Sequence, residues 1–184
     1  MSHQLNWEIN TLHDLSVTDY HHVLALRASI FIVEQNCPYQ DIDDKDLSAF
    51  HVYGKIDQNI VAVCRILPPG ISYAEISIGR VAVSMGYRGT NVGNDLMHQT
   101  IYFIENRWGE KDIRISAQQH LTSFYGRFGF IQVSEMYLED DDHPTLADSV
   151  YEMQERLVGE AYEGEDVEAY EEERLVGGVY DLPL

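Results

Sequence analysis

The sequence predicts an α/β fold in which helices flank both faces of a central mixed sheet. Strand-like segments occur in candidate antiparallel pairs near both ends of the chain. Between these pairs, two further strand-like segments are separated by one long amphipathic segment, which is the pattern of a parallel βαβ unit. A chain of 184 residues is long enough for one such domain with a single core.

The first part of the chain combines a strand pattern with a helix pattern. Residues 5–9 place apolar side chains at every second position, which predicts a short strand. Residues 20–31 place apolar side chains three and four positions apart, which predicts a helix. Ser16 and Thr18 precede this helix and are candidate caps for its N-terminus.

Two strands of a hairpin follow after a polar segment. Residues 50–56 and 60–67 are rich in apolar and β-branched side chains, and polar residues 57–59 separate them. A Pro-Pro-Gly sequence directly after residue 67 ends the second strand. We therefore expect an antiparallel hairpin here.

The middle of the chain contains the predicted βαβ unit. Residues 75–83 form its first strand, and residues 113–117 form its second. The amphipathic segment at 92–108 is the helix between them. Strands joined in this way lie parallel in the sheet, with the helix packed on one face.

The predicted domain ends with a short helix and a second pair of strands. The helix spans residues 121–128 and is closed by Gly129. Strands at 130–133 and 150–157 then pair across the acidic loop at 140–148.

The acidic charge of the protein is concentrated in its C-terminal part. The formal net charge is −19, and residues 135–184 contribute −15 of it through 17 acidic and 2 basic side chains. No stripe of Lys and Arg with interleaved aromatic residues offsets this charge. We therefore expect no nucleic-acid partner.

Composition divides the chain into a domain and an arm. Residues 1–157 form the predicted domain, whereas residues 158–184 are rich in Glu, Tyr, Gly and Val without an apolar period. Within the second part, the sequence of residues 155–159 recurs at 173–177. We expect an acidic arm, and a homodimer if its apolar residues pair with a sheet edge of a neighbouring subunit.

Cysteine content and hydropathy point to a cytoplasmic protein. Cys37 and Cys64 are too few and too far apart for a C-x-x-C motif, so both are expected to be reduced thiols in the core or near the site. No apolar run approaches the roughly 20 residues needed to cross a membrane. The polar start of the chain does not resemble a signal peptide.

A small-residue turn between the strand at 75–83 and the helix at 92–108 is suited to binding an anion. Backbone N–H groups at a helix start lack intrahelical partners, and the helix dipole adds partial positive charge there. Such a turn suits a diphosphate.

The turn and several other segments resemble the GNAT superfamily of N-acetyltransferases. The segment from Arg88 to Asn94 is similar to the acyl-CoA loop of that family, Gln/Arg-x-x-Gly-x-Gly/Ala, with Asn91 where Gly is usual. Because Asn enters the left-handed region more readily than most residues, we expect the turn to form at a cost of about 1 kcal/mol or less. The other segments resemble the ElaA-like branch in particular. They lie at 26–40, 46–47, 51, 62–67, 78–81, 117–121 and 124–130.

The resemblance covers about residues 5–157 and implies a GNAT fold, in which two adjacent parallel strands splay apart. Acetyl-CoA enters between these strands as a co-substrate, and no metal is required. Main-chain groups of the first strand and N–H groups of the loop are the expected contacts. These residues are Val81, Ala82, Val83, Arg88, Gly89, Thr90, Asn91, Val92, Gly93 and Asn94.

The same resemblance implies one catalytic residue, and a position along the chain suggests a second. Tyr125 corresponds to a tyrosine that stands near the sulfur of coenzyme A and donates a proton to the leaving thiolate. Glu34 follows the first helix and is the leading candidate for the base that deprotonates the amine. His51, His120 and Glu75 are further candidates for that base.

The carboxylate-rich segment at 41–46 does not match the pattern of a calcium-binding loop. Its fifth position is Lys45, its sixth is Asp46 rather than Gly, and its twelfth is Val52 rather than Glu. We therefore expect a solvated loop and no metal site.

The favoured function is transfer of an acetyl group from acetyl-CoA to a small-molecule or protein amine, without a covalent enzyme intermediate. An alternative is a non-catalytic module that binds or senses acyl-CoA. A third hypothesis is an acyl-homoserine lactone synthase, because that family shares the Arg-x-x-x-Phe start and an acidic loop. The Arg88 loop speaks against it.

Overall fold

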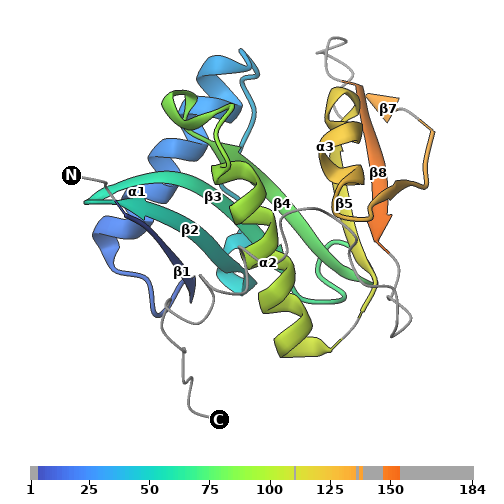
Figure 1. Ribbon diagram of the computed structural model, residues 1–184, viewed down its shortest axis with the longest axis horizontal. Coiled ribbons are helices and arrows are strands. Elements are labelled where there is room, and N and C mark those ends of the chain that lie inside the picture. The colour runs from blue at the N-terminus through green and yellow to red at the C-terminus, as the bar shows by residue number, and fades with distance from the viewer. Residues whose placement is uncertain (1–3, 110, 136, 139–146, 154–184) are drawn as a thin grey trace.

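A computed structural model describes residues 4–109, 111–135, 137–138 and 147–153. Its strands are β1 (Leu5–Thr11), β2 (Phe50–Ile56), β3 (Asn59–Leu67), β4 (Ile76–Val83), β5 (Ile113–Gln118), β6 (Ile131–Gln132), β7 (Tyr137–Leu138) and β8 (Ala147–Met153). They form one mixed sheet in the order β1-β2-β3-β4-β5-β8-β6, with β7 paired to β8. The predicted mixed sheet is therefore confirmed (Figure 1).

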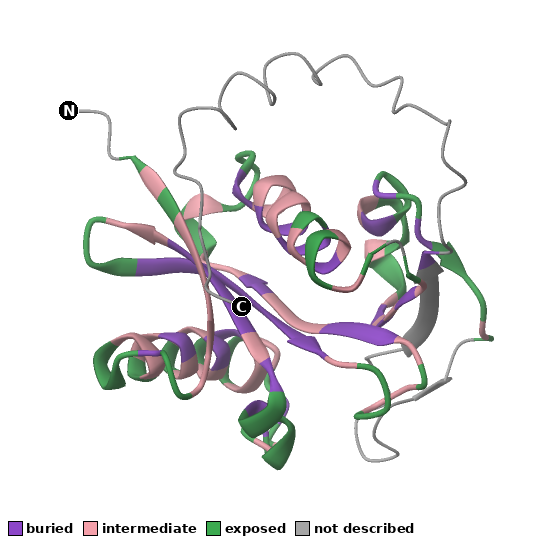
Figure 2. Cartoon of the chain, turned by 90° about the horizontal axis from the view of Figure 1, so that it is seen from below, coloured by how far each residue is buried: buried purple, intermediate pink, exposed green. Residues whose placement is uncertain are grey.

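Helices cover both faces of this sheet, as predicted. They are α1 (Val17–Arg27), α2 (Val92–Trp108) and α3 (Thr122–Gly126), with shorter turns η1 (Ala28–Glu34), η2 (Asp44–Ser48), η3 (Met85–Tyr87) and η4 (Gln119–Leu121). Figure 2 shows α1 on one side of the sheet and α2 and α3 on the other. Each layer is held by its own apolar cluster.

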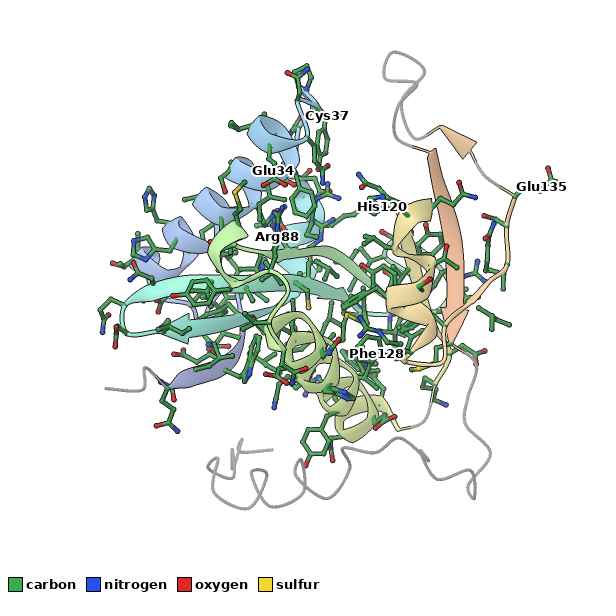
Figure 3. All side chains as sticks on the ribbon, turned by 45° about the horizontal axis from the view of Figure 1, so that its top comes forward. Glu34, Cys37, Arg88, His120, Phe128 and Glu135 are labelled. Atoms are coloured by element: carbon green, nitrogen blue, oxygen red, sulfur yellow. The ribbon has the colours of Figure 1, made fainter. Side chains whose placement is uncertain are left out.

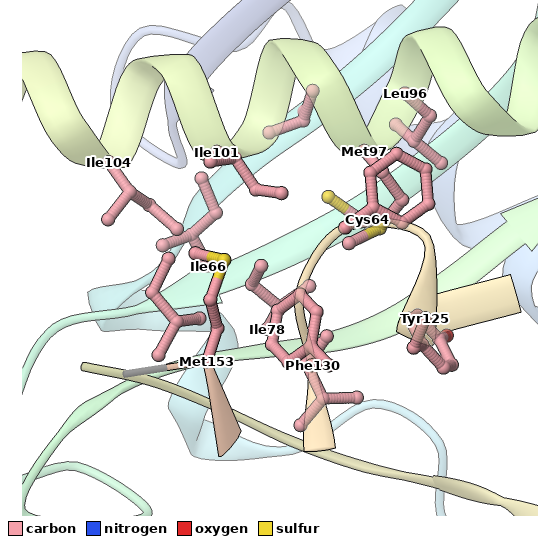
Figure 4. Close-up of a cluster of buried hydrophobic side chains, with 14 of the residues drawn as sticks. Cys64, Ile66, Ile78, Leu96, Met97, Ile101, Ile104, Tyr125, Phe130 and Met153 are labelled. Atoms are coloured by element: carbon pink, nitrogen blue, oxygen red, sulfur yellow. The ribbon is translucent and has the colours of Figure 1, made fainter. Parts of the chain in front are cut away.

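The larger cluster lies between the sheet and α2. Leu96, Met97 and Ile104 of α2 are completely buried, and Ile66 of β3 and Ile78 of β4 face them (Figure 4). Complete burial of one such side chain stabilises the fold by about 1.5–3 kcal/mol. The helix forms over the residues that the sequence predicted, because its apolar face has this sheet to pack on.

The first helix differs from the prediction in its type. Ser16 caps α1, since its hydroxyl accepts a hydrogen bond from the Asp19 N–H at 3.0 Å, and Thr18 lies inside the helix. The α-helix ends at Arg27, and the chain continues to Glu34 as the π-helix η1. Ile30 is the buried residue of this π-helix, and it belongs to the apolar cluster under α1.

The two strands of the βαβ unit are parallel and separate toward their C-terminal ends. Pairing runs from Ile76 opposite Ile113 to Ile78 opposite Ile115. Beyond that pair, β4 continues to Val83 on β3, and β5 pairs on its other edge with β8 as far as Gln118. The splayed strands that the family resemblance implied are therefore present (Figure 1).

A β-bulge in β4 marks the place where the strands separate. The register with β3 shifts between Arg65 opposite Gly79 and Val63 opposite Ala82. Arg80 lies in this bulge with a φ of 54°, in the left-handed region that an arginine rarely adopts.

The last predicted elements are shorter than expected. The helix predicted at 121–128 is divided into η4 and α3, and β6 covers only two residues of the strand predicted at 130–133. The predicted pairing is confirmed, because Ile131 of β6 lies opposite Glu152 of β8. The end of the predicted last strand, at 154–157, and the arm at 158–184 lie outside the described residues. Over the described part of the chain, no helix has both the length and the apolar character to cross a membrane.

Candidate functional site

The loop between β4 and α2 is built on the end of β4. The Ser84 N–H donates to the carbonyl oxygen of Val61 at 2.8 Å, which extends the pairing with β3 by one residue. The 3₁₀ turn η3 follows, and the Thr90 hydroxyl closes it by donating to the Tyr87 carbonyl at 2.6 Å. Gly89 has a φ of 72° and is the left-handed residue of the loop.

Asn91 does not adopt the conformation that the sequence suggested. Its φ of −79° and ψ of −7° lie in the right-handed region, so the expected backbone cost at this position is absent. The side chain donates to the Asp95 carboxylate at 2.7 Å and accepts from the Asn94 amide at 2.9 Å. Both contacts direct it along the helix rather than over the helix start.

The N-terminus of α2 is open to an anion. Asn91 is the N-cap residue, yet its side chain makes no capping hydrogen bond. The N–H groups of Gly93 and Asn94 lie in the first turn, where no carbonyl of the helix can accept from them. A methyl group added at Gly93 would meet Phe124 at 3.7 Å and Val83 at 3.8 Å, which is ordinary contact. Packing of the protein itself therefore does not require glycine here, whereas close approach of a diphosphate does.

Polar main-chain groups of β4 face the gap beside β5. In an antiparallel pair, the polar groups of successive residues point alternately toward and away from the partner strand. Ser84 is hydrogen-bonded to β3, so the groups of Val83 and Val81 point away from β3 and those of Ala82 toward it. On this side the Val83 carbonyl oxygen accepts from Arg88 Nε at 2.9 Å, whereas the main-chain groups of Val81 and the Val83 N–H have no neighbouring strand to pair with in the described part of the chain.

Tyr125 lies on α3, which follows η4 at the end of β5. Its ring is buried, with 3 % exposed, and packs edge-on against Phe124 and Phe130. Phe124 is the side chain that approaches Gly93. Phe124 thereby brings α3 against the start of α2, and Tyr125 belongs to the same apolar cluster as Ile78 of β4 (Figure 4).

Glu34 and Arg88, predicted for different roles, form an ion pair. Arg88 Nη1 lies 2.6 Å from Glu34 Oε1, and Nη2 lies 2.9 Å from Oε2. Figure 3 shows the two side chains side by side, with His120 beyond β4 at the end of β5. Both oxygens of the Glu34 carboxylate are occupied, so the geometry does not favour Glu34 as the base.

The other candidate bases lie in three different surroundings. Glu75 pairs with Arg114 at 2.8 Å where β4 and β5 are still joined, at the end away from the gap. His51 is 1 % exposed, and burial lowers its pKa. Its Nε2 lies 3.2 Å from the carbonyl oxygen of Asp46, which makes it part of the core. His120 is exposed on η4, at the open end of β5.

The acidic segment at 41–46 is a buried ionic cluster rather than a solvated loop, so that prediction was wrong. Asp41 and Asp46 are 2 % and 1 % exposed. Asp41 binds Arg27 Nε at 3.0 Å and Arg80 Nε at 2.7 Å. Asp46 binds Arg27 Nη1 at 2.8 Å and Arg65 Nη1 at 2.9 Å.

This cluster explains how Arg80 is held in its rare conformation. Its guanidinium lies between the rings of Tyr39, at 5.4 Å, and Phe31, at 5.9 Å, with Asp41 at its Nε. Burial tends to raise the pKa of Asp46, but hydrogen bonds from Arg27 and Arg65 outweigh burial and lower it. The carboxylate is therefore charged at neutral pH.

A signal for this cluster was present in the sequence. Arg27 falls on the apolar face of the predicted helix, and Arg65 interrupts an otherwise apolar strand. Arginines at such positions are buried, and a buried cation requires a carboxylate partner.

Neither a disulfide nor a metal site is found among the described residues. Cys37 and Cys64 are buried thiols outside any disulfide, as predicted, and burial raises the pKa of the Cys64 thiol to about 12. Among the described residues, no three His, Cys, Asp or Glu side chains are grouped so that they could hold a metal ion.

Comparison with known proteins places this geometry in a family. Residues 19–141 match the acetyltransferase (GNAT) domain family. Protein ElaA of Escherichia coli is 42 % identical over 138 residues, which cover 74 % of this chain and 90 % of ElaA. A UPF0039 protein of Synechocystis is 39 % identical over 141 residues, covering 76 % of this chain and 90 % of that protein.

Solved structures agree. The crystal structure of Escherichia coli ElaA superposes with a TM-score of 0.76 at 38 % identity and covers 82 % of this chain and all of that one. An acyl-CoA N-acyltransferase from Pseudomonas aeruginosa gives a TM-score of 0.75 at 35 % identity, covering 81 % and 99 %. A GNAT acetyltransferase from Elizabethkingia anophelis, solved with acetyl-CoA bound, shares the fold with a TM-score of 0.55 at 14 % identity, covering 82 % and 97 %.

Proposed function

The chain belongs to the GNAT acetyltransferase family, and from this premise we propose that it moves an acetyl group from acetyl-CoA to a primary amine by direct transfer. The observation that supports this most is the separation of β4 from β5 after Ile78 and Ile115, which leaves main-chain groups of Val81 and the N–H of Val83 without a strand partner at that edge. The pantetheine arm of coenzyme A has amide groups that can pair with such an edge.

The loop and the helix start are the matching site for the diphosphate. In this proposal the N–H groups of Gly89 to Asn94 point at the phosphate oxygens, and Gly93 allows their close approach. The Val92 N–H donates to the Thr90 hydroxyl at 3.4 Å, and the Asn91 side chain makes no capping hydrogen bond, so the N–H groups of Gly93 and Asn94 are oriented as donors before the coenzyme binds. Acetyl-CoA bound in the related fold of the Elizabethkingia enzyme supports the choice of donor.

Catalysis in this proposal consists mainly of positioning. The amine nitrogen attacks the thioester carbonyl carbon, a C–N bond forms, and the C–S bond breaks as the tetrahedral intermediate collapses. The leaving sulfur takes the proton of the Tyr125 hydroxyl, and the nitrogen loses a proton to a base. His120 is the best placed of the four candidate bases, because it is exposed at the open end of β5. Orientation of two reactants supplies about 7–11 kcal/mol of the barrier reduction.

Binding and turnover are measured separately to test this. Calorimetry with coenzyme A and with acetyl-CoA reports binding. Release of the coenzyme thiol in the presence of an amine panel reports transfer, with little background because both cysteines of the protein are buried. Binding without thiol release would instead support a non-catalytic acyl-CoA-binding module, and absence of binding would contradict both functions.

The role of Tyr125 gives a sharper test. We expect Tyr125→Phe to lower kcat about 100-fold, since proton transfer by a positioned side chain contributes on this scale. The Kd for coenzyme A is expected to stay within about twofold, because the ring packing is kept. Tyr102→Phe, an exposed tyrosine on α2, is the control and should leave both values unchanged. An unchanged kcat for Tyr125→Phe would remove this residue from the mechanism.

A further inference from the structure

The guanidinium of Arg88 connects three elements. Its Nη1 and Nη2 bind the two carboxylate oxygens of Glu34, and its Nε donates to the carbonyl oxygen of Val83 at 2.9 Å. Glu34 is the last residue of η1, and Val83 is the last residue of β4. Arg88 is the first residue of the segment from Arg88 to Asn94, called the coenzyme loop below. Each of the three guanidinium nitrogens therefore donates a hydrogen bond to an acceptor inside the protein.

Few apolar contacts join η1 to the loop beside this ion pair. A pocket of about 380 Å³ lies between η1 and the start of the loop. Its lining consists of Leu26, Ser29, Ile30, Val33, Glu34, Ser84 and Met85. Val33 and Met85 are 75 % and 70 % exposed, so the two segments do not bury each other's apolar side chains at this rim. The ion pair is thus a main direct link between the π-helix and the loop.

The loop needs such a link in order to be ordered before coenzyme binds. Arg88, Gly89 and Thr90 are exposed, and Gly89 is in a left-handed conformation that a free chain would sample only in part. A side-chain bond from Arg88 back to Val83 closes the turn at η3, and Glu34 fixes the orientation of that side chain. Prior ordering of a binding loop raises affinity because less freedom is lost on binding.

We infer that Glu34 is a positioning residue for the diphosphate loop rather than the base for the amine. This inference rests on the proposed function. Glu34 therefore acts through Arg88, which fixes the conformation of the loop between β4 and α2. In that conformation the N–H groups of the loop and of the first turn of α2 point toward the phosphates. The carboxylate itself contacts neither the amine nor the thioester.

Two acetyl donors distinguish a positioning residue from a base. Acetyl-CoA contains the diphosphate, whereas acetyl-pantetheine presents the same thioester without it. For Glu34→Gln we expect kcat/KM with acetyl-CoA to fall about threefold to fivefold, the effect of losing a well-formed but partly exposed ion pair. With acetyl-pantetheine, kcat/KM of the variant should stay within about twofold of the parent protein. The Kd for coenzyme A should rise by the same factor as kcat/KM falls.

A double-mutant cycle tests whether the pair acts as a unit. Glu34→Gln, Arg88→Met and the double variant are compared by the Kd for coenzyme A, and the double variant should be no weaker than Arg88→Met alone. Glu75→Gln is the matched control. It breaks an ion pair of similar exposure with Arg114 at the opposite end of β4 and should leave the Kd unchanged. Thermal unfolding of every variant verifies that each is folded.

Three results would overturn the inference. One is an equal loss with both donors, accompanied by a changed pH profile of kcat, which is the behaviour of a base. Another is tighter binding of coenzyme A by Glu34→Gln, which would mean that Glu34 withholds Arg88 from the phosphates. The third is a double variant whose loss of coenzyme A affinity equals the sum of the losses of the two single variants. If the parent protein itself binds no coenzyme A, the proposed function fails, and that outcome is separate from these three.

Discussion

Asp41 is the residue on which several elements depend. It binds Arg27 at the end of α1 and Arg80 in the bulge of β4, and it accepts a hydrogen bond from the Tyr39 hydroxyl at 3.1 Å. Its carboxylate therefore fixes the loop before η2 and supports the left-handed backbone of Arg80 at the mouth of the gap.

Removing this charge is expected to destabilise the protein strongly. In Asp41→Asn, the buried Arg27 loses one of its two carboxylate partners, and the loss of one member of a buried pair costs about 3–5 kcal/mol. Urea unfolding measures the change. Asp44→Asn, in the same segment but exposed, is the control and should change stability by no more than about 0.5 kcal/mol. Equal stability of Asp41→Asn and the parent would show that the cluster contributes nothing to the fold.

The acid sensitivity of the fold should trace to Asp46. Its pKa is lowered from 3.8 in the folded state, because the hydrogen bonds from Arg27 and Arg65 outweigh the effect of burial. The unfolded chain therefore binds the proton first as pH falls, so the stabilisation from this group is complete above about pH 4 and disappears below it. Unfolding free energies measured from pH 6 to pH 2 should fall less steeply for Asp46→Asn than for the parent protein. Parallel curves would contradict this.

The role of a single residue could be predicted from the sequence where it depends only on neighbouring residues. The Ser16 cap depends on a side chain and its own helix start, and it was found. The buried state of Asp41 and Asp46 depends on arginines 14 to 39 positions away, which local hydrophilicity does not reveal. Likewise, the pairing of Glu34 with Arg88 joins residues 54 positions apart.

At the scale of elements, the coenzyme loop is the segment whose conformation matters most. Gly89 has a φ of 72°, whereas Gly86, three residues earlier, has no positive φ, and an added methyl group would meet nothing within 4 Å at either position. The two glycines therefore differ in backbone conformation and not in available space, which makes them a matched pair.

Gly89→Ala should weaken coenzyme binding. An L-residue in the left-handed region costs about 1–2 kcal/mol, so the loop leaves its binding conformation and the Kd for coenzyme A rises about fivefold to thirtyfold. Gly86→Ala should leave the Kd within about twofold. Calorimetry with coenzyme A decides between these outcomes. Equal affinities of the two variants would mean that the loop does not contact the coenzyme.

Element prediction succeeded where one pattern dominates a long segment. The bounds of α2 were predicted to the residue, because its apolar period extends over 17 residues. The change from α-helix to π-helix after Arg27 left no local signal, since the apolar residues keep a helical spacing. The separation of β4 from β5 came from the family resemblance, because strand pairing is not visible in either strand alone.

At the scale of the whole molecule, the gap lies between two differently built halves of the sheet. Strands β1 to β4 form a continuous antiparallel half covered by α1 and α2, and β5, β8 and β6 form the second half with α3. The halves share the short β4–β5 pairing and the packing of α3 against α2.

The central claim is that coenzyme A binds along the open edge of β4 with its diphosphate at the start of α2. Amide NMR spectra recorded during a titration with coenzyme A test it most directly. We predict that the N–H signals of Val81, Val83 and Gly89 to Asn94 shift and exchange more slowly with solvent, while those of the distant strand β1 stay unchanged. Saturating coenzyme A with no change at Val81, Val83 and the loop, or with changes confined to other surfaces, would contradict the account.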